Sequence, residues 1–547
     1  MSRKSILLGA VLGMTAMMSA PMANAQIAST TSNGLNYADG WAVKAPIDKP
    51  RIIITTDPEL DDNNSMIRFL LFSTDYDVEG LIYTSSQFHW RGDGKGTLWW
   101  VSGREYDRPG LNFKPMTHYR WDEGQQFIDD VVNAYEEAYP NLKVHDSRYP
   151  TPEYLRSKVA WGNCDFDGDF SKDTPGSELI KRVLLDDEPG PVFVQAWGGC
   201  STIARALKSI EDIYSQQPGY DELKKKVSQK LVLCLSGDQD NLYTNYIRPY
   251  WPDVKQQPTG VGAPSLSFMS AAAAKTDLHK QIYGSEWMNQ NILSKGKLGE
   301  LYRVWGDGKQ YAKGDIYDFF GFSERGMEQL RKEGYVVWCP LQPKGTFLSE
   351  GDTFCYLNLI DNGLYGYVQN WGGWAGYQQP RRQQQQNFAS SDMSSIQASL
   401  GTGSQTTSAS SQQSRAAEVK TPDFLPPVMY SFAERMLWSV TPKYEDANHE
   451  PQISGPTAMT AHAGETLKLK YTVSDPDKGQ RVETTWWKHP SCSYEGECNV
   501  DTPSSASTTF TVPADAKSGD EIHLVLQATD NGALPLTRYL RLVITVE

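Results

Sequence analysis

The sequence predicts an α/β domain with a mostly parallel sheet and flanking helices, followed by a C-terminal all-β sandwich domain. Two observations indicate this. Between residues 49 and 235, short β-branched runs that end in Gly or acidic residues alternate with amphipathic stretches of helical period, which is typical of βαβ units. From about residue 453 the period changes to strict alternation of apolar and polar residues, as in the strands of a β-sandwich.

Four apolar runs in the first part of the chain predict strands of the parallel sheet. The first run is followed by a predicted helix at 65–72, and the third by a predicted helix at 202–210. Because ligands of a parallel sheet bind outside the carboxyl ends of its strands, the residues that follow these runs are candidates for a site. The predicted strands are 51–56, 78–84, 192–197 and 231–235.

Changes of composition along the chain predict its domain boundaries. We expect the α/β domain at 46–445. A tract rich in Gln, Ser and Thr at 378–426 cannot bury a core and is interpreted as a low-complexity insertion. The β-sandwich is expected at 453–547, where alternating segments are separated by turn residues such as Asp530-Asn531-Gly532.

The N-terminus predicts export. Residues 1–25 have a positive start, a short apolar run and an Ala-Asn-Ala cleavage site, which together indicate a secretory signal peptide. The mature protein is therefore expected to be secreted or periplasmic. In such an oxidising compartment, Cys492 and Cys498 are close enough in sequence to predict a small-loop disulfide.

Composition excludes two classes of protein. Hydrophobic residues make up 39% of the 547 residues and charged residues 22%, which is ordinary for a globular protein and argues against a multispan membrane protein. The formal net charge is −14, so a polyanion such as a nucleic acid is not expected as a partner.

The segment from Thr55 to Asp62 is the most informative motif. Three carboxylates, those of Asp57, Asp61 and Asp62, lie at the end of a predicted strand and the start of the following helix. Carboxylates this close repel one another, and a hard divalent cation such as Ca²⁺ would remove that repulsion. The alternative is that Asp61 or Asp62 caps the helix while the others are solvated.

This loop resembles the signature of nucleoside hydrolases, in which D-x-D-P-x-x-D-D follows a strand. The wider pattern is similar to the secreted, nucleoside-hydrolase-like family that is described as cellulose-binding and carries a C-terminal Ig-like β-sandwich. The matching positions in the loop are Asp57, Pro58, Asp61 and Asp62. The supporting stretches are 197–207, 349–353, 371–374 and 529–532.

The resemblance implies a Ca²⁺ site and a catalytic base. Asp57 matches the carboxylate that binds Ca²⁺ and takes a proton from the attacking water, and Asp62 matches a second metal ligand. Asp352 resembles the distant carboxylate that completes the metal shell, and the backbone carbonyl near Ser201 resembles the main-chain ligand. Asp61 matches the residue that hydrogen-bonds sugar hydroxyls.

The resemblance also implies further substrate-binding residues. Gln87 falls where nucleoside hydrolases place an amide on the sugar, and Glu286 and Asn289 fall near their acid–amide pair for the ribose. His89 lies near the expected pocket and either assists the leaving group or is structural. Trp371 and Trp374 either stack on a sugar ring at the pocket mouth or pack under the sheet.

Three positions depart from the hydrolase pattern. Thr55 stands in place of the first Asp, and Glu59 in place of a Gly, which restricts the loop geometry. Gly351 stands in place of the His that helps the leaving group depart in some members. We therefore expect a Ca²⁺ site but not necessarily a nucleoside substrate.

Two functions follow from these expectations. The first is an exported Ca²⁺-dependent hydrolase of N-glycosyl or related sugar bonds. The second is a non-catalytic protein that binds cellulose or another glucan, through the same pocket or through an exposed Trp in the sandwich, where Trp486 and Trp487 point to opposite faces of a strand.

Overall fold

The computed structural model of the chain describes residues 43, 45–107, 115–122, 124–257, 262–377 and 422–547. The signal peptide predicted at 1–25 and most of the insertion predicted at 378–426 lie outside these residues. Within the described part of the chain, no helix is both long enough and apolar enough to cross a bilayer.

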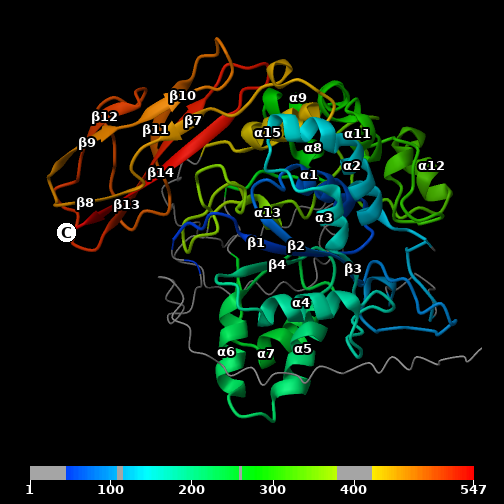
Figure 1. The fold of residues 1–547 in the computed structure, drawn as a ribbon. Coiled ribbons are helices and arrows are strands. Elements are labelled where there is room, and N and C mark those ends of the chain that lie inside the picture. The colour runs from blue at the N-terminus through cyan, green and yellow to red at the C-terminus, as the bar shows by residue number, and fades with distance from the viewer. Residues whose placement is uncertain (1–42, 44, 108–114, 123, 258–261, 378–421) are drawn as a thin grey trace, which may run out of the picture.

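Six parallel strands form the sheet of the first domain, in the order β3-β2-β1-β4-β5-β6 (Figure 1). The predicted parallel sheet is thus confirmed. The chain builds the sheet outward from β1 on one side, then crosses to build β4, β5 and β6 on the other. The strands are β1 (Arg51–Thr56), β2 (Asp77–Tyr83), β3 (Val159–Trp161), β4 (Val192–Ala196), β5 (Leu231–Leu235) and β6 (Lys255–Gln256).

Helices cover both faces of this sheet. On one face Ile52 and Ile54 pack into a core with α1 (Leu60–Leu71), α2 (Phe127–His145) and α15 (Leu425–Trp438). On the other face Ile53 packs against helices α4 and α5, and α6 adds Val227 (Figure 1). Burial on both faces explains why the strands are continuous apolar runs. The second set is α4 (Pro175–Leu185), α5 (Ser201–Tyr214) and α6 (Tyr220–Lys230).

Two predicted boundaries shift. Helix α1 begins at Leu60, five residues before the predicted start, so Asp61 and Asp62 belong to its first turn and not to a loop. Helix α15 begins at Leu425, so the insertion predicted to run to residue 426 ends before it. The remaining helices are α3 (Pro152–Ser157), α7 (Arg248–Tyr250), α8 (Ser270–Ala273), α9 (Asp277–Tyr283), α10 (Ser285–Met288), α11 (Gly296–Leu301), α12 (Met327–Lys332) and α13 (Phe354–Leu357).

The C-terminal domain is built from mostly antiparallel strands, which confirms the all-β prediction. Its largest sheet has the order β11-β13-β14-β8, and β12-β9 and β10-β7 form two-stranded sheets. A separate apolar core includes Leu469, Trp486, Phe510 and Leu542. The strands are β7 (Gln452–Ser454), β8 (Ala458–Ala461), β9 (Thr466–Lys470), β10 (Thr472–Ser474), β11 (Glu483–Lys488), β12 (Ser507–Thr511), β13 (Glu521–Thr529) and β14 (Thr537–Val546).

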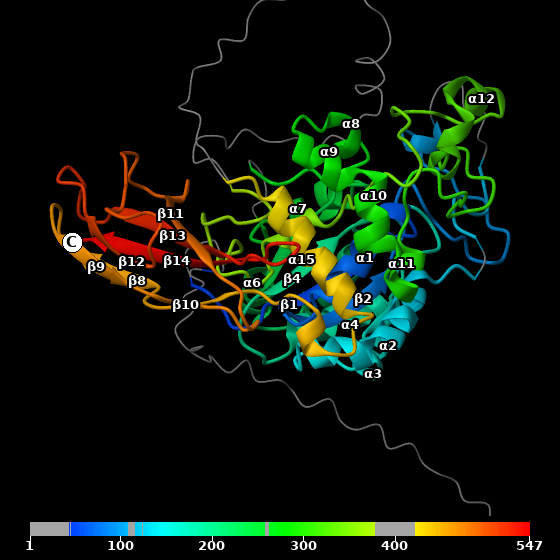
Figure 2. The ribbon, with the colours of Figure 1, turned by 90° about the horizontal axis from the view of Figure 1, so that it is seen from above.

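The two domains lie side by side and share an aromatic interface (Figures 1 and 2). Trp374 is 1% exposed, and its indole N–H donates to the hydroxyl of Tyr539 in β14 at 3.5 Å. The guanidinium of Arg541 lies 4.9 Å from the ring centre of Trp371. Trp374 therefore has no face open to a sugar, so its interpretation as a stacking residue is wrong, whereas Trp371 is half-buried against Arg541 and its stacking role stays a prediction.

The sandwich tryptophans are also used internally. Trp486 packs in the core of the C-terminal domain, and its indole N–H donates to the Ser505 carbonyl at 3.0 Å. Trp487 faces the other way, as the strand period predicts, but it packs against the α/β domain, with its ring 6.5 Å from that of Phe424. Trp486 therefore presents no open face for glucan, and Trp487 is half-buried against the α/β domain.

The disulfide predicted between Cys492 and Cys498 is not formed, and both residues are free thiols. The Sγ atom of Cys492 instead accepts the backbone N–H of His523 at 3.1 Å, while Sγ of Cys498 lies 3.8 Å from the Gly496 carbonyl. Both residues belong to the packing of the C-terminal domain core.

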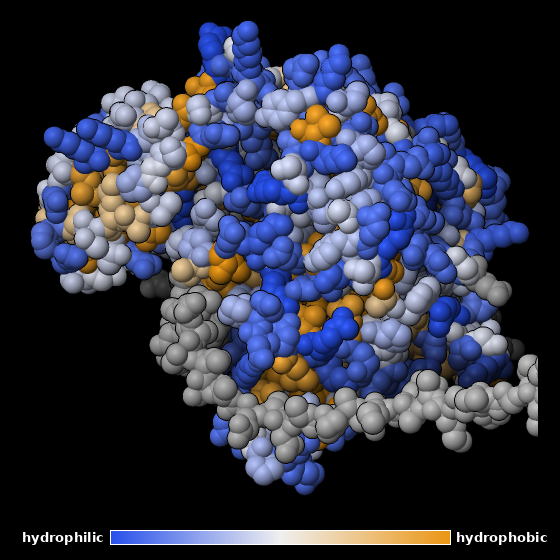
Figure 3. All heavy atoms as spheres, in the orientation of Figure 1, coloured by the Kyte–Doolittle hydropathy of each residue, from blue (hydrophilic) through white to orange (hydrophobic). Residues whose placement is uncertain are grey.

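The surface is largely polar on the face that Figure 3 shows. The face shown in Figure 3 is mostly hydrophilic, and apolar side chains form only small separate patches on it. The large apolar side chains that are exposed, such as Leu98, Ile213 and Met327, come from different elements. No extended apolar surface therefore competes with the interior as a candidate site on this face.

Candidate functional site

The candidate site lies at the carboxyl ends of β1 and β4, where the strand order reverses. In open parallel sheets the crevice at such a reversal is the usual ligand site. Asp57 directly follows β1, and the Gly198-Gly199 turn follows β4. A Cβ atom at Gly198 would lie 3.0 Å from Oδ1 of Asp57. Because Gly198 has no Cβ atom, the backbone of the turn after β4 can lie directly against the carboxylate of Asp57, which follows β1.

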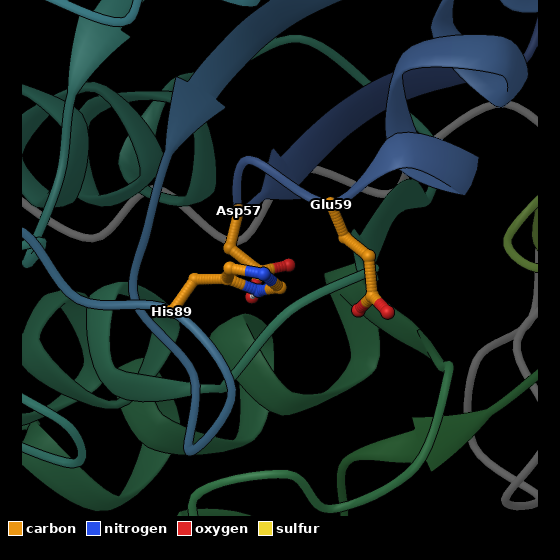
Figure 4. A group of neighbouring side chains, drawn as sticks. All are labelled: Asp57, Glu59 and His89. Atoms are coloured by element: carbon orange, nitrogen blue, oxygen red, sulfur yellow. Dashed lines mark hydrogen bonds and ion pairs between the residues drawn. The ribbon is translucent and has the colours of Figure 1, made fainter. Parts of the chain in front are cut away.

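Asp57 is fully buried and held from one side. Its Oδ2 atom accepts a hydrogen bond from the hydroxyl of Ser86, and Nδ1 of His89 lies 3.0 Å from the same oxygen. Figure 4 shows that Asp57 and Glu59 come from the loop between β1 and α1, and that His89 comes from the segment after β2. The other oxygen, Oδ1, has no hydrogen-bond partner among the described residues.

Asp61 and Asp62 project from the first turn of α1. The hydroxyl of Thr56 donates to Asp62, and Asp62 is also hydrogen-bonded to Asp352. Oδ2 of Asp61 accepts from the Ser349 hydroxyl at 3.3 Å, whereas its Oδ1 atom has no partner in the described part of the chain. The structure therefore brings Asp57, Asp61, Asp62 and Asp352 into one buried group, as the resemblance implied.

The position of the Asp61 carboxylate explains why residue 351 is a glycine. A Cβ atom there would lie 2.2 Å from Oδ2 of Asp61, closer than any real contact between such atoms. The position therefore cannot carry a His while Asp61 keeps this conformation. The departure from the hydrolase pattern at Gly351 is coupled to where the Asp61 carboxylate lies.

Burial and mutual repulsion both act on the pKa values of this group. Burial, followed by the negative charge of neighbouring carboxylates, raises the pKa of Glu59, Asp61 and Asp62 well above their ordinary values. Burial likewise raises the pKa of Asp352. Oxygen atoms of Glu59, Asp61 and Asp62 lie within 4.8 Å of one another. Buried, unpartnered and mutually repelling oxygens are the donor set that a hard divalent cation such as Ca²⁺ requires.

Glu59 was treated in the sequence only as a departure, yet it is a full member of the group. Its carboxylate is within 4.8 Å of ligand atoms in two sets, one with Asp61 and Asp62 and one with Asp57 and His89. Its backbone is extended, with φ −93° and ψ 154°, so the loop does not need glycine here. Crowding of four acids within six residues was the signal that could have found it.

Ser201, near which the resemblance implied a main-chain ligand, follows the turn after β4. It is the first residue of α5, and its hydroxyl lies 3.2 Å from both the Thr84 hydroxyl and the Asn163 carbonyl. No described contact joins it to the carboxylates. The turn after β4 approaches Asp57 three residues earlier, at Gly198. The main-chain ligand expected near Ser201 therefore stays a prediction, and Gly198 is the residue of this turn whose approach to Asp57 the structure shows.

The three remaining polar candidates are placed differently. Gln87 is buried next to the site, but its Oε1 atom accepts the backbone N–H of Glu105 at 3.2 Å. Glu286 in α10 and Asn289 in the turn that follows are exposed. No described contact links either of them to the carboxylates. The structure thus keeps Gln87 as a wall of the site and does not bring Glu286 and Asn289 into it.

A cationic wall adjoins the acidic group. Arg120 donates to Asp315 at 2.8 Å, and Nη1 of Arg120 lies 3.9 Å from Glu105. Burial and then the charge of Arg120 lower the pKa of His89. His89 is therefore a neutral imidazole at neutral pH, and it uses its Nδ1–H to donate to Asp57.

A second acidic cluster lies beside the first and was also missed. Ligand atoms of Cys200, Asp238 and Asp240 lie within 4.8 Å of one another. Both oxygens of Asp238 accept backbone N–H groups, from Tyr243 and Thr244. Burial raises the pKa of Asp240 to about 7. These interactions fix the turn after β5, so the cluster is accounted for by local structure.

Comparison with known proteins gives two family matches. Residues 51–377 match the family model described as cellulose-binding Sde182, nucleoside hydrolase-like domain. Residues 466–546 match the model described as cellulose-binding protein Sde0182, C-terminal domain. The comparison with curated proteins found no match.

One similar solved structure comes from Saccharophagus degradans. It is described as a nucleoside hydrolase-related hypothetical protein that is associated with carbohydrate metabolism. The sequences are 26% identical, the match covers 91% of this chain and all of the other, and the TM-score is 0.61. Both the parallel-sheet domain and the C-terminal strands are therefore shared with a protein of the same architecture.

Proposed function

Since the chain belongs to the Sde182 family of cellulose-binding proteins with a nucleoside-hydrolase-like domain, we propose that it is an exported Ca²⁺-dependent hydrolase of N-glycosyl or related sugar bonds. The observation that carries this proposal is the buried group of Asp57, Asp61, Asp62 and Asp352 at the strand-order reversal, with two carboxylate oxygens left without partners. The description of the family as cellulose-binding supports a carbohydrate as the partner.

Asp57, Asp62 and Asp352 would hold the cation, with Glu59 as a further oxygen donor. When bound, Ca²⁺ would acidify a water and hold sugar hydroxyls. The donor set supports this assignment because Asp57, Asp62 and Asp352 are buried, Glu59 is half-buried beside them, and Oδ1 of Asp57 has no hydrogen-bond partner among the described residues. Without a cation, four or five carboxylates would share one dry site.

Asp57 is the base in this proposal. Ser86 and His89 both engage Oδ2, so the carboxylate cannot rotate freely and Oδ1 is left to accept a proton from water. A base positioned in this way typically contributes 10²–10⁴ to the rate. The negative carboxylates around it favour the positive charge that develops on the sugar ring.

Asp61 takes the role of sugar binding. One of its oxygens is held by Ser349 and the other is free of hydrogen bonds to described residues. A free carboxylate oxygen is a strong acceptor for a sugar hydroxyl. Glu286 and Asn289, the acid–amide pair expected on the sugar, are exposed and have no described contact with these carboxylates, so the sugar contacts proposed here do not include them.

A second function, binding of a glucan without turnover, is favoured by a specific observation. The position that carries a leaving-group His in some hydrolases is Gly351, and a side chain is sterically excluded there. His89 is neutral and donates toward Asp57. A site that lacks a proton donor for the leaving group could hold a sugar without cleaving it, in agreement with the family description as cellulose-binding.

One experiment separates the two functions. Purified mature protein is incubated with a panel of nucleosides and aryl glycosides, with added Ca²⁺ or with a chelator, and release of the leaving group is measured. Asp57→Asn is compared with Asp187→Asn, which alters a fully exposed carboxylate. Turnover that needs Ca²⁺ and is lost only in D57N supports the hydrolase. Cellulose pull-down by wild type and D57N alike, with no turnover of any substrate, supports binding alone.

A further inference from the structure

The junction between α2 and the C-terminal domain holds two buried histidines in direct contact. His145 ends α2, and His449 lies in the segment that leads into β7; they are 8% and 4% exposed. The Nδ1 atom of His145 lies 3.0 Å from Nε2 of His449. The other nitrogen of His145 lies 2.8 Å from the Thr441 carbonyl. The other nitrogen of His449 lies 2.8 Å from Oδ1 of Asp477.

Counting the hydrogens along this row of hydrogen bonds shows that two neutral rings carry one hydrogen too few to make all of the contacts. The Thr441 carbonyl only accepts, so Nε2 of His145 must carry a hydrogen. The Asp477 carboxylate also accepts the backbone N–H of His449 at 2.7 Å, so Nδ1 of His449 must carry one as well. Two neutral imidazoles then have no hydrogen left for the contact between the rings. In that case the lone pairs on Nδ1 of His145 and Nε2 of His449 would face each other with no hydrogen between them. Their separation of 3.0 Å is that of a hydrogen bond.

We propose that His145 and His449 bind one proton between them, and that this shared proton clamps the α/β domain to the C-terminal domain. His449 holds it as an imidazolium that donates to Asp477 on one side and to His145 on the other. The clamp joins three segments that are far apart in sequence: the end of α2, the connector before β7, and the loop between β10 and β11. Burial and the charge of His449 lower the pKa of His145, so the pair takes up one proton and resists a second.

The surroundings favour a single positive charge at this place. The ring of Tyr444 stacks on His449 with centroids 3.6 Å apart, and the ring of Trp438 stacks on His145 at 5.4 Å. The charged and titratable groups around the junction are Asp475 and Asp477 from the β10–β11 loop, Tyr444 from the connector, Asp146 with its partner Arg148 after α2, and Glu434 and Arg435 from α15, with Lys295 acting on Glu434 and Arg435 lying 5.3 Å from the Trp438 ring. The carboxylate in direct contact with His449 is Asp477, and Asp475 also interacts with His449, so one imidazolium is stabilised.

The sign of the pH dependence follows from proton counts. In the unfolded chain each histidine titrates near pH 6.5. Above that pH the unfolded chain loses both protons while the folded pair keeps one, so raising the pH destabilises the fold. Below it the unfolded chain binds two protons and the folded pair one, so lowering the pH also destabilises it. The pair stabilises the folded state most near pH 6.5. On either side of that pH, its contribution to the folding equilibrium constant falls by up to tenfold per pH unit.

The test compares the full chain with two variants. Wild type, His145→Gln and His449→Gln are unfolded with denaturant between pH 5 and pH 9, and His462→Gln, which alters an exposed histidine, serves as the matched control. We expect the stability difference between wild type and either clamp variant to peak near pH 6.5, and H462Q to keep the wild-type peak. A difference that is flat with pH overturns the proposal.

A second measurement does not depend on the variants folding. In wild-type protein labelled with ¹⁵N at histidine, ring nitrogen shifts are recorded at pH 7.5, about one unit above the ordinary histidine pKa. The expected result is one imidazolium and one neutral ring with its hydrogen on Nε2 at the junction. Two neutral rings there at this pH overturn the shared proton, whatever the variants do.

Discussion

His89 and Asp57 form a buried pair in which Nδ1 of the imidazole lies 3.0 Å from Oδ2 of the carboxylate. The hydroxyl of Ser86 donates to the same oxygen, so the two contacts fix the plane of the carboxylate and leave Oδ1 without a hydrogen-bond partner among the described residues. This arrangement gives His89 a positioning role: it orients the proposed base, and its effect on the reaction acts through Asp57.

Replacing the positioning histidine tests that role. We expect His89→Gln to lower kcat of the proposed hydrolysis by about 10- to 100-fold, because a small misplacement of a reacting group is costly, while KM changes little. Ser86→Ala should act in the same direction. If His89 and Ser86 both act through the Asp57 carboxylate, the effects of H89Q and S86A on kcat are not additive in the double variant. A large rise in KM with unchanged kcat would instead assign His89 to substrate binding.

Metal removal should change stability in a residue-specific way. We expect added Ca²⁺ to raise the Tm of the chelated wild-type protein, since a ligand at 100 times its Kd stabilises by about 2.7 kcal/mol. Asp352→Asn should lose this response, yet its metal-free form should be no less stable than wild type, because burial and neighbouring negative charge already disfavour the Asp352 anion. Thermal scans with and without Ca²⁺ measure both, with D187N as the control. An unchanged Ca²⁺ response in D352N contradicts the assignment of this ligand.

Gly351 should resist any side chain. We expect Gly351→Ala to destabilise the protein by about 1–3 kcal/mol, because its Cβ would lie 2.2 Å from Asp61 and force an overpacked contact. Denaturant unfolding measures the change. The matched test is the same substitution in an Asp61→Ala background, where room has been made. The cost of G351A should shrink there, and an equal cost in both backgrounds would show that the contact with Asp61 is not its cause.

Trp374 should matter for stability and not for glucan binding. Since it is 1% exposed between the domains, we expect Trp374→Ala to destabilise the protein by about 3–5 kcal/mol. Leu98→Ala, at a side chain that is 64% exposed, should change stability by less than about 0.5 kcal/mol. Unfolding curves measure both. A W374A protein that folds as well as wild type but no longer sediments with cellulose would restore the stacking interpretation.

Much of the fold and part of the site could be predicted from the sequence. The run Ile52-Ile53-Ile54 predicts a doubly buried strand because adjacent side chains in a strand point to opposite faces, and both faces here are covered by helices. The acids after it predict a site at the carboxyl end of that strand. The family is a further prediction that the comparisons confirm, since its motifs are local stretches of sequence.

The sequence by itself determined the elements, the order in which they follow one another and the crowding of carboxylates after β1, because these depend on neighbours in the chain. Only the tertiary structure decided that the turn after β4 meets Asp57 at Gly198, and that Trp371 and Trp374 face β14. It also decided that His145 meets His449, 304 residues away. The physical reason is that such contacts depend on how whole layers of helices and strands pack together and on where a glycine leaves room for close approach. Local sequence patterns do not determine either of these.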